Sequence, residues 1–343
     1  MLTPRERLLE ALKGMPVDRP PIICPGGMMT MAVHEAMRIS ETSWPAAHRD
    51  PAAMSALIRA TREATGLECL SAPFCMTVEA EAMGCRVDLG DDDVLPHVLE
   101  EPVGGPDDFG ALLPLDPEKT GRVRTTLDAI KILKGGAGDL PVIGAVVGPF
   151  SLAAMLMRAE SLMRLLRRNP DAADAMLSIT EGAVLDFARM QARAGADCVM
   201  IAEPTGTGEV LGNRHFARFV MPRLSRILLA LSESGVPAMI HICGDLRPAY
   251  PAIREMSAGL PSPLVLSVDS MVAGHAMARE LPGVTRVGNV DTHLLAGTDS
   301  AKVAEVSRRA AREFNIVSPA CGLAPCTPVE NLLALARTVR GEA

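Results

Sequence analysis

The sequence predicts an α/β fold, a (β/α)8 TIM barrel with an N-terminal excursion. Short and almost wholly apolar segments alternate with amphipathic ones from about residue 140 to the end of the chain. Such apolar strands are typical of a parallel sheet that is covered by helices on both faces. Eight βα units suit a barrel of this length. The candidate strands are centred near residues 22, 69, 143, 198, 239, 265, 286 and 317.

A doubly wound open sheet is the other architecture that this alternation allows. No Gly-x-Gly-x-x-Gly sequence follows a candidate strand, and no Walker loop is present, which weakens that alternative. No linker composition divides the 343 residues, so we expect a single barrel domain over residues 1–343. Residues 86–118 are rich in Asp, Glu, Pro and Gly, and they are the best candidate for an inserted excursion.

Polar capping residues mark the starts of several predicted helices. Thr3 and Glu6 have the spacing of a capping box, and Thr327 and Glu330 repeat it before the last apolar stretch. Pro51 follows an aspartate, as first-turn prolines commonly do. We therefore expect helices to begin at these three places.

The composition excludes several classes of protein. The formal net charge is −7, with 34 basic and 41 acidic residues, which argues against a nucleic-acid partner. No run of about 18 apolar residues predicts a membrane span, and no signal peptide is evident. We therefore expect a cytoplasmic monomer or homodimer whose eight cysteines stay reduced. Aromatic residues make up only 3%, so aliphatic side chains and the 20 methionines must fill the core.

Polar residues gather where the later strands end. The carboxyl ends of barrel strands are where TIM-barrel sites lie. For the carboxylates and the asparagine, substrate binding and capping of the next helix both remain open. The residues at these ends are Glu203, His241, Cys243, Asp269, Asn289, Asp291 and Cys321.

His241, Cys243 and Cys321 form a candidate metal site. The first two are separated by one residue on a strand, so their side chains point to the same side. Cys321 would reach them across the mouth of the barrel. Two thiolates and an imidazole suit Zn²⁺, and three protein ligands leave one position open, as in catalytic zinc sites. Taken singly, His241 also fits a hydrogen-bonded core histidine and Cys243 a buried apolar residue, and Cys326 is a further candidate ligand.

Six stretches of the chain resemble a known family. They are RERLLEALKGMPVDRPP, AEPTGTGEVLG, HICGD, LSVDS, VGNVD and ACGLAPCTPVENLLAL. Together they resemble the uroporphyrinogen decarboxylase superfamily, and within it the cobamide-dependent methyltransferases that serve coenzyme M with methyl groups from methanol- or methylamine-specific corrinoid proteins. The resemblance implies a (β/α)8 barrel with zinc on His241, Cys243 and Cys321. Metal-free decarboxylases carry arginines after the first strand, but CPGGMMTM has none, which argues against porphyrinogen decarboxylation.

This resemblance also implies a reaction. The enzyme would move a methyl group from a methyl-Co(III) corrinoid, held by a partner protein, to a zinc-bound thiolate such as coenzyme M or a similar thiol. Apart from the resemblance, their position at strand ends makes Glu203, Asp269 and Asn289 our candidates for substrate binding. Met28, Met29 and Met31 are our candidates for apolar walls that would keep the site dry.

Other functions remain open at this stage. The enzyme could instead load the corrinoid from a methyl halide or a methoxyl compound, or use a folate as acceptor. Outside catalysis, the barrel could be a binding module for a corrinoid protein.

Overall fold

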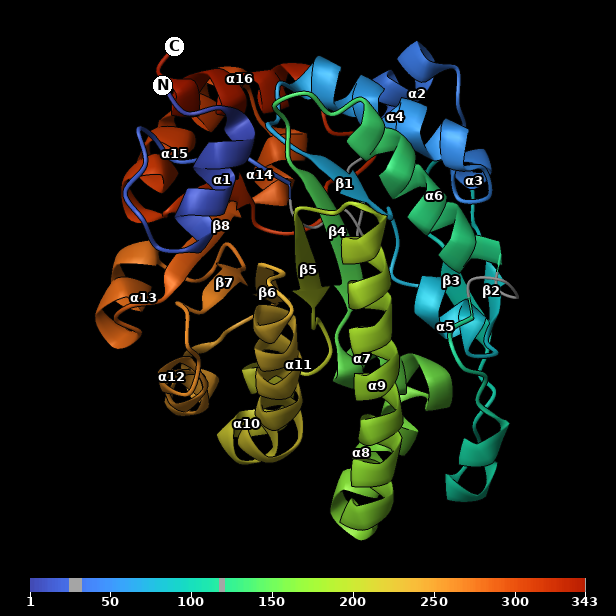
Figure 1. Cartoon of the computed structure of the whole chain (residues 1–343). Coiled ribbons are helices and arrows are strands. Elements are labelled where there is room, and N and C mark those ends of the chain that lie inside the picture. Colours follow the sequence, from blue (N-terminus) through green and yellow to red (C-terminus); the bar gives the residue numbers. More distant parts are fainter. Residues whose placement is uncertain (25–32, 117–120, 343) are drawn as a thin grey trace.

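A curved sheet of seven parallel strands forms the centre of the molecule (Figure 1). The computed structural model describes residues 1–24, 33–116 and 121–342. The strands follow the order β1-β4-β5-β6-β7-β8-β9, so neighbours in the sequence are neighbours in the sheet. This is the predicted TIM-barrel-like α/β fold. The strands are β1 (Leu70–Ala72), β4 (Val142–Val147), β5 (Cys198–Ala202), β6 (Ala238–Ile242), β7 (Val265–Val268), β8 (Thr285–Val290) and β9 (Ile316–Pro319).

The prediction of a full strand near residue 22 needs correction, because the structure has only a bridge there. Ile22 pairs in parallel with Val317 of β9. The Ile23 N–H donates to the Val317 carbonyl at 3.0 Å, and the Glu68 N–H donates to the Ile22 carbonyl at 2.8 Å. Pro21, having no N–H, cannot extend the ladder. The segment nevertheless joins β9 to the residues that precede β1.

Helices surround this sheet (Figure 1). From β4 onward at least one helix follows each strand, as crossover connections between parallel strands require. The helices are α1 (Pro4–Leu12), α2 (His34–Ser40), α3 (Trp44–Ala47), α4 (Pro51–Thr65), α5 (Val78–Ala82), η1 (Pro106–Ala111), α6 (Gly121–Gly135), α7 (Pro149–Met157), α8 (Ala159–Arg168), α9 (Pro170–Ala194), α10 (Gly208–His215), η2 (Phe216–Val220), α11 (Met221–Glu233), η3 (Arg247–Ala249), α12 (Tyr250–Ala258), α13 (Gly274–Glu280), α14 (Thr292–Gly297), α15 (Ser300–Glu313) and α16 (Val329–Arg340).

Two of the three predicted helix starts are confirmed. The Glu6 N–H donates to Thr3 Oγ1 at 3.2 Å, and the Thr3 N–H donates to Glu6 Oε2 at 2.9 Å, which completes the capping box. α4 begins at Pro51, after an N-cap aspartate. The prediction for Thr327 is wrong, because α16 begins two residues later and has no side-chain cap among the described residues. Thr327 is instead buried, so its side chain packs inward at this turn.

The interior has the composition that the sequence predicts. Every residue of β4 and β5 is buried, and aliphatic and methionine side chains dominate the core. Burial of this kind is the main stabilising contribution in a domain of this size. Within the described ranges, no helix is both long and apolar enough to cross a membrane.

A small antiparallel hairpin lies beside the barrel sheet (Figure 1). It pairs β2 (Arg86–Asp88) with β3 (His97–Glu100), and the 3-10 helix η1 follows it. These elements lie within residues 86–118. That this segment is an insertion into the barrel stays a prediction.

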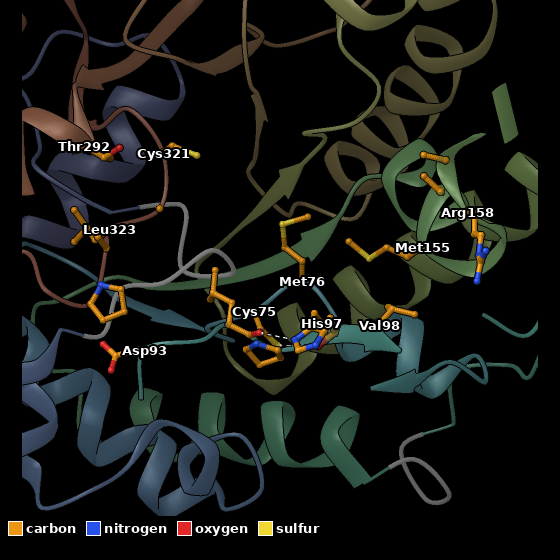
Figure 2. Close-up of a pocket in the computed structure, with 18 of the residues that line it drawn as sticks. Cys75, Met76, Asp93, His97, Val98, Met155, Arg158, Thr292, Cys321 and Leu323 are labelled. Carbon is orange, nitrogen blue, oxygen red and sulfur yellow. Dashed lines mark hydrogen bonds between the residues drawn. The ribbon is translucent and has the colours of Figure 1, made fainter. Parts of the chain in front are cut away.

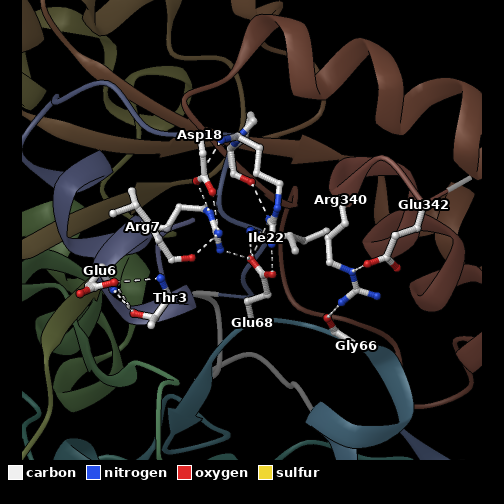
Figure 3. A network of polar contacts seen from close by, with 12 residues as sticks. Thr3, Glu6, Arg7, Asp18, Ile22, Gly66, Glu68, Arg340 and Glu342 are labelled. Carbon is white, nitrogen blue, oxygen red and sulfur yellow. Dashed lines mark hydrogen bonds and ion pairs between the residues drawn. The ribbon is translucent and has the colours of Figure 1, made fainter.

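A network of buried ion pairs lies at the bridge between β9 and β1 (Figure 3). The Arg7 guanidinium, only 3% exposed, donates to Asp18 Oδ1 at 2.7 Å. One carboxylate oxygen of Glu68, Oε2, accepts two hydrogen bonds. Arg19 Nη1 donates to it at 3.0 Å, and the Ile22 N–H donates to it at 3.4 Å. Arg7 Nη1 is also 3.7 Å from Glu68. The network therefore fixes the bridge to α1 and to the start of β1.

We predict that Glu68→Gln destabilises the fold without changing its shape. The amide keeps the volume but leaves the buried Arg7 guanidinium and its neighbour Arg19 short of one negative charge, which we expect to lower the free energy of unfolding by roughly 2–3 kcal/mol. Urea unfolding measures the change. Glu10→Gln is the matched control, since Glu10 pairs with Lys13 on the surface. Equal stabilities for the two variants would contradict this role of Glu68.

Candidate metal centre

The structure brings His241, Cys243 and Cys321 together at the carboxyl ends of their strands. Their ligand atoms all lie within 4.8 Å of one another. His241 Nε2 is 3.2 Å from Cys243 Sγ, and the two sulfurs are 4.0 Å apart. His241 is buried, whereas the two cysteines are half-buried. Tetrahedral Zn–S bonds separate two sulfurs by about 3.8 Å, so the spacing fits a tetrahedral metal with one position left over.

The two thiols also favour a cation on electrostatic grounds. The hydrogen bond from the Cys243 thiol lowers the pKa of Cys321. The same contact, together with burial, raises the pKa of Cys243. The pair therefore loses one proton readily and the second with difficulty. A divalent ion between the sulfurs would stabilise both thiolates at once, because a coordinated thiol is deprotonated outright.

Ser267 fixes the orientation of the imidazole. The parallel register of β6 and β7 pairs His241 with Ser267, and His241 Nδ1 lies 3.0 Å from Ser267 Oγ. With Nδ1 engaged by the hydroxyl, Nε2 faces the two sulfurs. Partners of this kind set the ring orientation and basicity of metal-binding histidines.

Two carboxylates hold the loop that follows Cys243. The Gly244 N–H donates to Asp269 Oδ2, and the Asp245 N–H donates to Glu209 Oε2, each at 3.1 Å. The Asn289 amide donates to the Asp269 carbonyl at 2.9 Å and so steadies the loop after β7. Asp269 thus holds the backbone next to Cys243, and Asn289 acts on the loop that carries Asp269. Their predicted contact with substrate stays a prediction.

Glu203 is fully buried beneath the same face of the barrel. Its carboxylate accepts from the N–H groups of Phe150, Ser151 and Gly206 at 2.8–3.1 Å and from the Ser151 hydroxyl. Burial raises the pKa of Glu203 to about 7, although these donors oppose the shift. The side chain ties the end of β5 to the start of α7. Its predicted contact with substrate also stays a prediction.

The other residues that the sequence singled out have different outcomes. Asp291 caps α14, since its Oδ1 accepts from the N–H groups of His293 and Leu294 at 2.8 and 2.9 Å. Cys326 is exposed and lies outside the metal-ligand cluster. The predicted walls at Met28, Met29 and Met31 fall outside the described residues.

A cavity of about 1000 Å³ opens beside Cys321. One wall comes from the hairpin, including His97 and Val98, and another from the end of α7, including Met155 (Figure 2). Leu323 lines it near Cys321. The methionine and aliphatic side chains make it largely apolar, with a few polar groups at its margin, as ligand cavities commonly are. Its volume exceeds that of a small thiol many times over.

Sequence reasoning missed Ser267, Glu209 and the cavity walls. Ser267 lies in the quoted LSVDS stretch, two residues before Asp269. When β6 and β7 are aligned with their carboxyl ends together, Ser267 is the residue opposite His241. Glu209 lies on the helix after β5, and only the folded loop shows its contact. His97 had no spacing that distinguished it from a surface histidine.

Comparisons with known proteins agree with this fold. Residues 3–341 match the model of the uroporphyrinogen decarboxylase (URO-D) family. The chain is 32% identical over 338 residues to methylcobamide:CoM methyltransferase MtaA of Methanosarcina barkeri, which covers 97% of this chain and 96% of that protein. It is 31% identical over 333 residues to MtbA of Methanosarcina acetivorans, covering 96% and 95%. A solved methyltransferase from Methanosarcina mazei superposes with a TM-score of 0.87 at 29% identity, over 99% of both chains.

The chain therefore belongs to the uroporphyrinogen decarboxylase family. Its full-length similarity to MtaA and MtbA places it among the methyltransferases of that family, and the protein is an enzyme of methyl transfer.

We predict that Ser267→Ala weakens metal binding while the barrel stays folded. Without the hydroxyl, His241 Nδ1 loses its partner and the ring loses its fixed orientation, which we expect to lower zinc affinity about 10- to 100-fold. Competition with a chromophoric chelator measures the affinity. Ser225→Ala is the control, because Ser225 Oγ only donates to the carbonyl one turn earlier in α11. Unchanged affinity in Ser267→Ala would remove the serine from the metal site.

Proposed function

We propose that this enzyme transfers a methyl group from a methylated corrinoid, carried by a partner protein, to the sulfur of a small thiol held at a zinc ion. Three observations support it. The His241, Cys243 and Cys321 donors suit zinc and leave one position open. A cavity of about 1000 Å³ is lined in part by Cys321, one of these three residues. The relatives MtaA and MtbA are methylcobamide:CoM methyltransferases by name.

The single observation that carries the proposal is the incomplete ligand set. A structural zinc site has four protein ligands, whereas a catalytic one keeps a place for water or substrate. Three ligands that converge at the mouth of a barrel therefore indicate substrate activation. When bound, zinc would keep an acceptor thiol as thiolate at neutral pH, where a free alkyl thiol is mostly protonated.

The residues of the chain then have distinct tasks. Ser267 directs the imidazole of His241 toward the metal. Asp269 and Glu209 hold the backbone that follows Cys243, so the thiolates stay in place during turnover. The apolar cavity wall keeps water from the reacting sulfur. A thiolate without a hydration shell is a stronger nucleophile than a hydrated one. The acceptor sulfur attacks the methyl carbon, and the electron pair of the cobalt–carbon bond remains on the corrinoid.

We predict that Cys243→Ala and Cys321→Ala each lose zinc and methyl transfer together. Removing one of three ligands should lower the rate more than ~100-fold while the far-ultraviolet circular dichroism stays unchanged. Metal analysis gives the zinc per chain, and the absorbance of methylcobalamin with added thiol gives the rate.

Cys326→Ala is the matched control, because Cys326 is exposed and outside the cluster. It should keep both zinc and activity. Stoichiometric zinc and full activity in Cys321→Ala would overturn the proposal.

A further inference from the structure

The eight cysteines of the chain differ sharply in burial. Cys243 and Cys321 are half-buried, and Cys326 is exposed. Thiol oxidation follows exposure, so an oxidant in solution reaches these three side chains before the others. The five buried cysteines are Cys24, Cys69, Cys75, Cys85 and Cys198.

Two of the three accessible sulfurs already lie close together. Cys243 Sγ is 4.0 Å from Cys321 Sγ, whereas Cys326 lies outside this group. A disulfide bond is about 2.05 Å long, so the two atoms must approach by about 2 Å to form one. Both cysteines lie in loops that follow their strands, and each is followed by a glycine. A loop can take up a movement of this size more easily than a paired strand can.

The cavity gives a small oxidant a route to one of these sulfurs. Cys321 lines the cavity (Figure 2), and Cys243 is not among the described residues that do so. Cys75 also lines it, but this residue is buried, and its sulfur accepts from the Arg122 guanidinium at 2.6 Å. An oxidant that enters the cavity therefore meets Cys321, with the Cys243 sulfur 4.0 Å away.

We propose that the candidate metal centre is also a redox switch, in which a peroxide joins Cys243 and Cys321 of the metal-free enzyme in a reversible disulfide. The inference rests on the function proposed above for its consequence. Oxidation removes two of the three zinc ligands and so stops methyl transfer until the disulfide is reduced.

The oxidation balances in two steps. The Cys321 sulfur forms a bond to one oxygen of hydrogen peroxide as the O–O bond breaks, which gives a sulfenic acid and one water. The Cys243 sulfur then forms the S–S bond, and the sulfenic oxygen leaves with the Cys243 thiol proton as a second water. The two thiols lose two electrons, which the peroxide gains. A dithiol such as dithiothreitol reverses the reaction by thiol–disulfide exchange.

Thiol counting in the full-length chain tests the inference. Metal-free enzyme, prepared with a chelator, is treated with one equivalent of hydrogen peroxide, and free thiols are then counted in denaturant. We expect the count to fall from eight to six, and dithiothreitol to restore both thiols and the capacity for zinc. Zinc-loaded enzyme should lose its thiols ~10-fold more slowly, because both sulfurs must leave the metal before they can join.

Peptide mapping without reduction identifies the partners. Cys321 and Cys326 fall in the same tryptic peptide, so Cys326→Ala is the variant that assigns the bond. It should still show the peptide of Cys243 joined to that of Cys321, whereas Cys321→Ala should lose this product. Circular dichroism confirms that both variants are folded.

The outcomes are distinct. A disulfide that contains Cys326 or Cys75, one that joins two chains, or metal-free enzyme that keeps all its thiols overturns the inference and leaves the proposed function standing. Conversely, the disulfide is measured without a methyl donor. If zinc-loaded enzyme methylates no thiol, the proposed function falls, while a Cys243–Cys321 bond still shows that the two residues form a redox pair.

Discussion

The geometry of the candidate metal centre depends on how the sheet closes. Cys243 follows β6 and Cys321 follows β9, and these strands are not neighbours. Their sulfurs meet only because the sheet curves far enough to bring the two strand ends to one mouth. The bridge between Ile22 and Val317 holds β9 at that curvature, and Glu68 secures the bridge through Arg19 and the Ile22 N–H. The ion pair of Arg19 and Glu68, near the N-terminus, thus helps to position Cys321, near the C-terminus.

The sequence predicted the fold class and the convergence of His241, Cys243 and Cys321 because both follow from simple rules of strand geometry. Strand alternation places His241 and Cys243 on one side of β6, and a barrel places strand ends at one mouth. Two predictions made from local sequence were wrong, because other features of the folded chain decided the structure at those places. Pro21 keeps the segment near residue 22 to a bridge, and Thr327 packs inward instead of capping α16.

What the sequence could not provide is the register between strands and the path of the loops. Ser267 faces His241 because of a register that no local pattern fixes. Glu209 reaches the Asp245 N–H only after α10 folds back over the barrel. The carboxylates at the strand ends illustrate the same limit. Asp291 caps a helix, Asp269 holds a loop and Glu203 is buried among donors, although all three occupy equivalent positions in the sequence pattern.

The hairpin of β2 and β3 lies outside the barrel sheet, yet it forms one wall of the cavity. Its side chains have little part in the core, and the candidate metal ligands come from other strands. Substitutions in this hairpin can therefore change the shape and charge of the cavity at small cost to the barrel or the metal centre. Such an arrangement separates the candidate metal centre from the part of the molecule that shapes the cavity. Relatives with the same ligands could then diverge in what they accept through this hairpin alone.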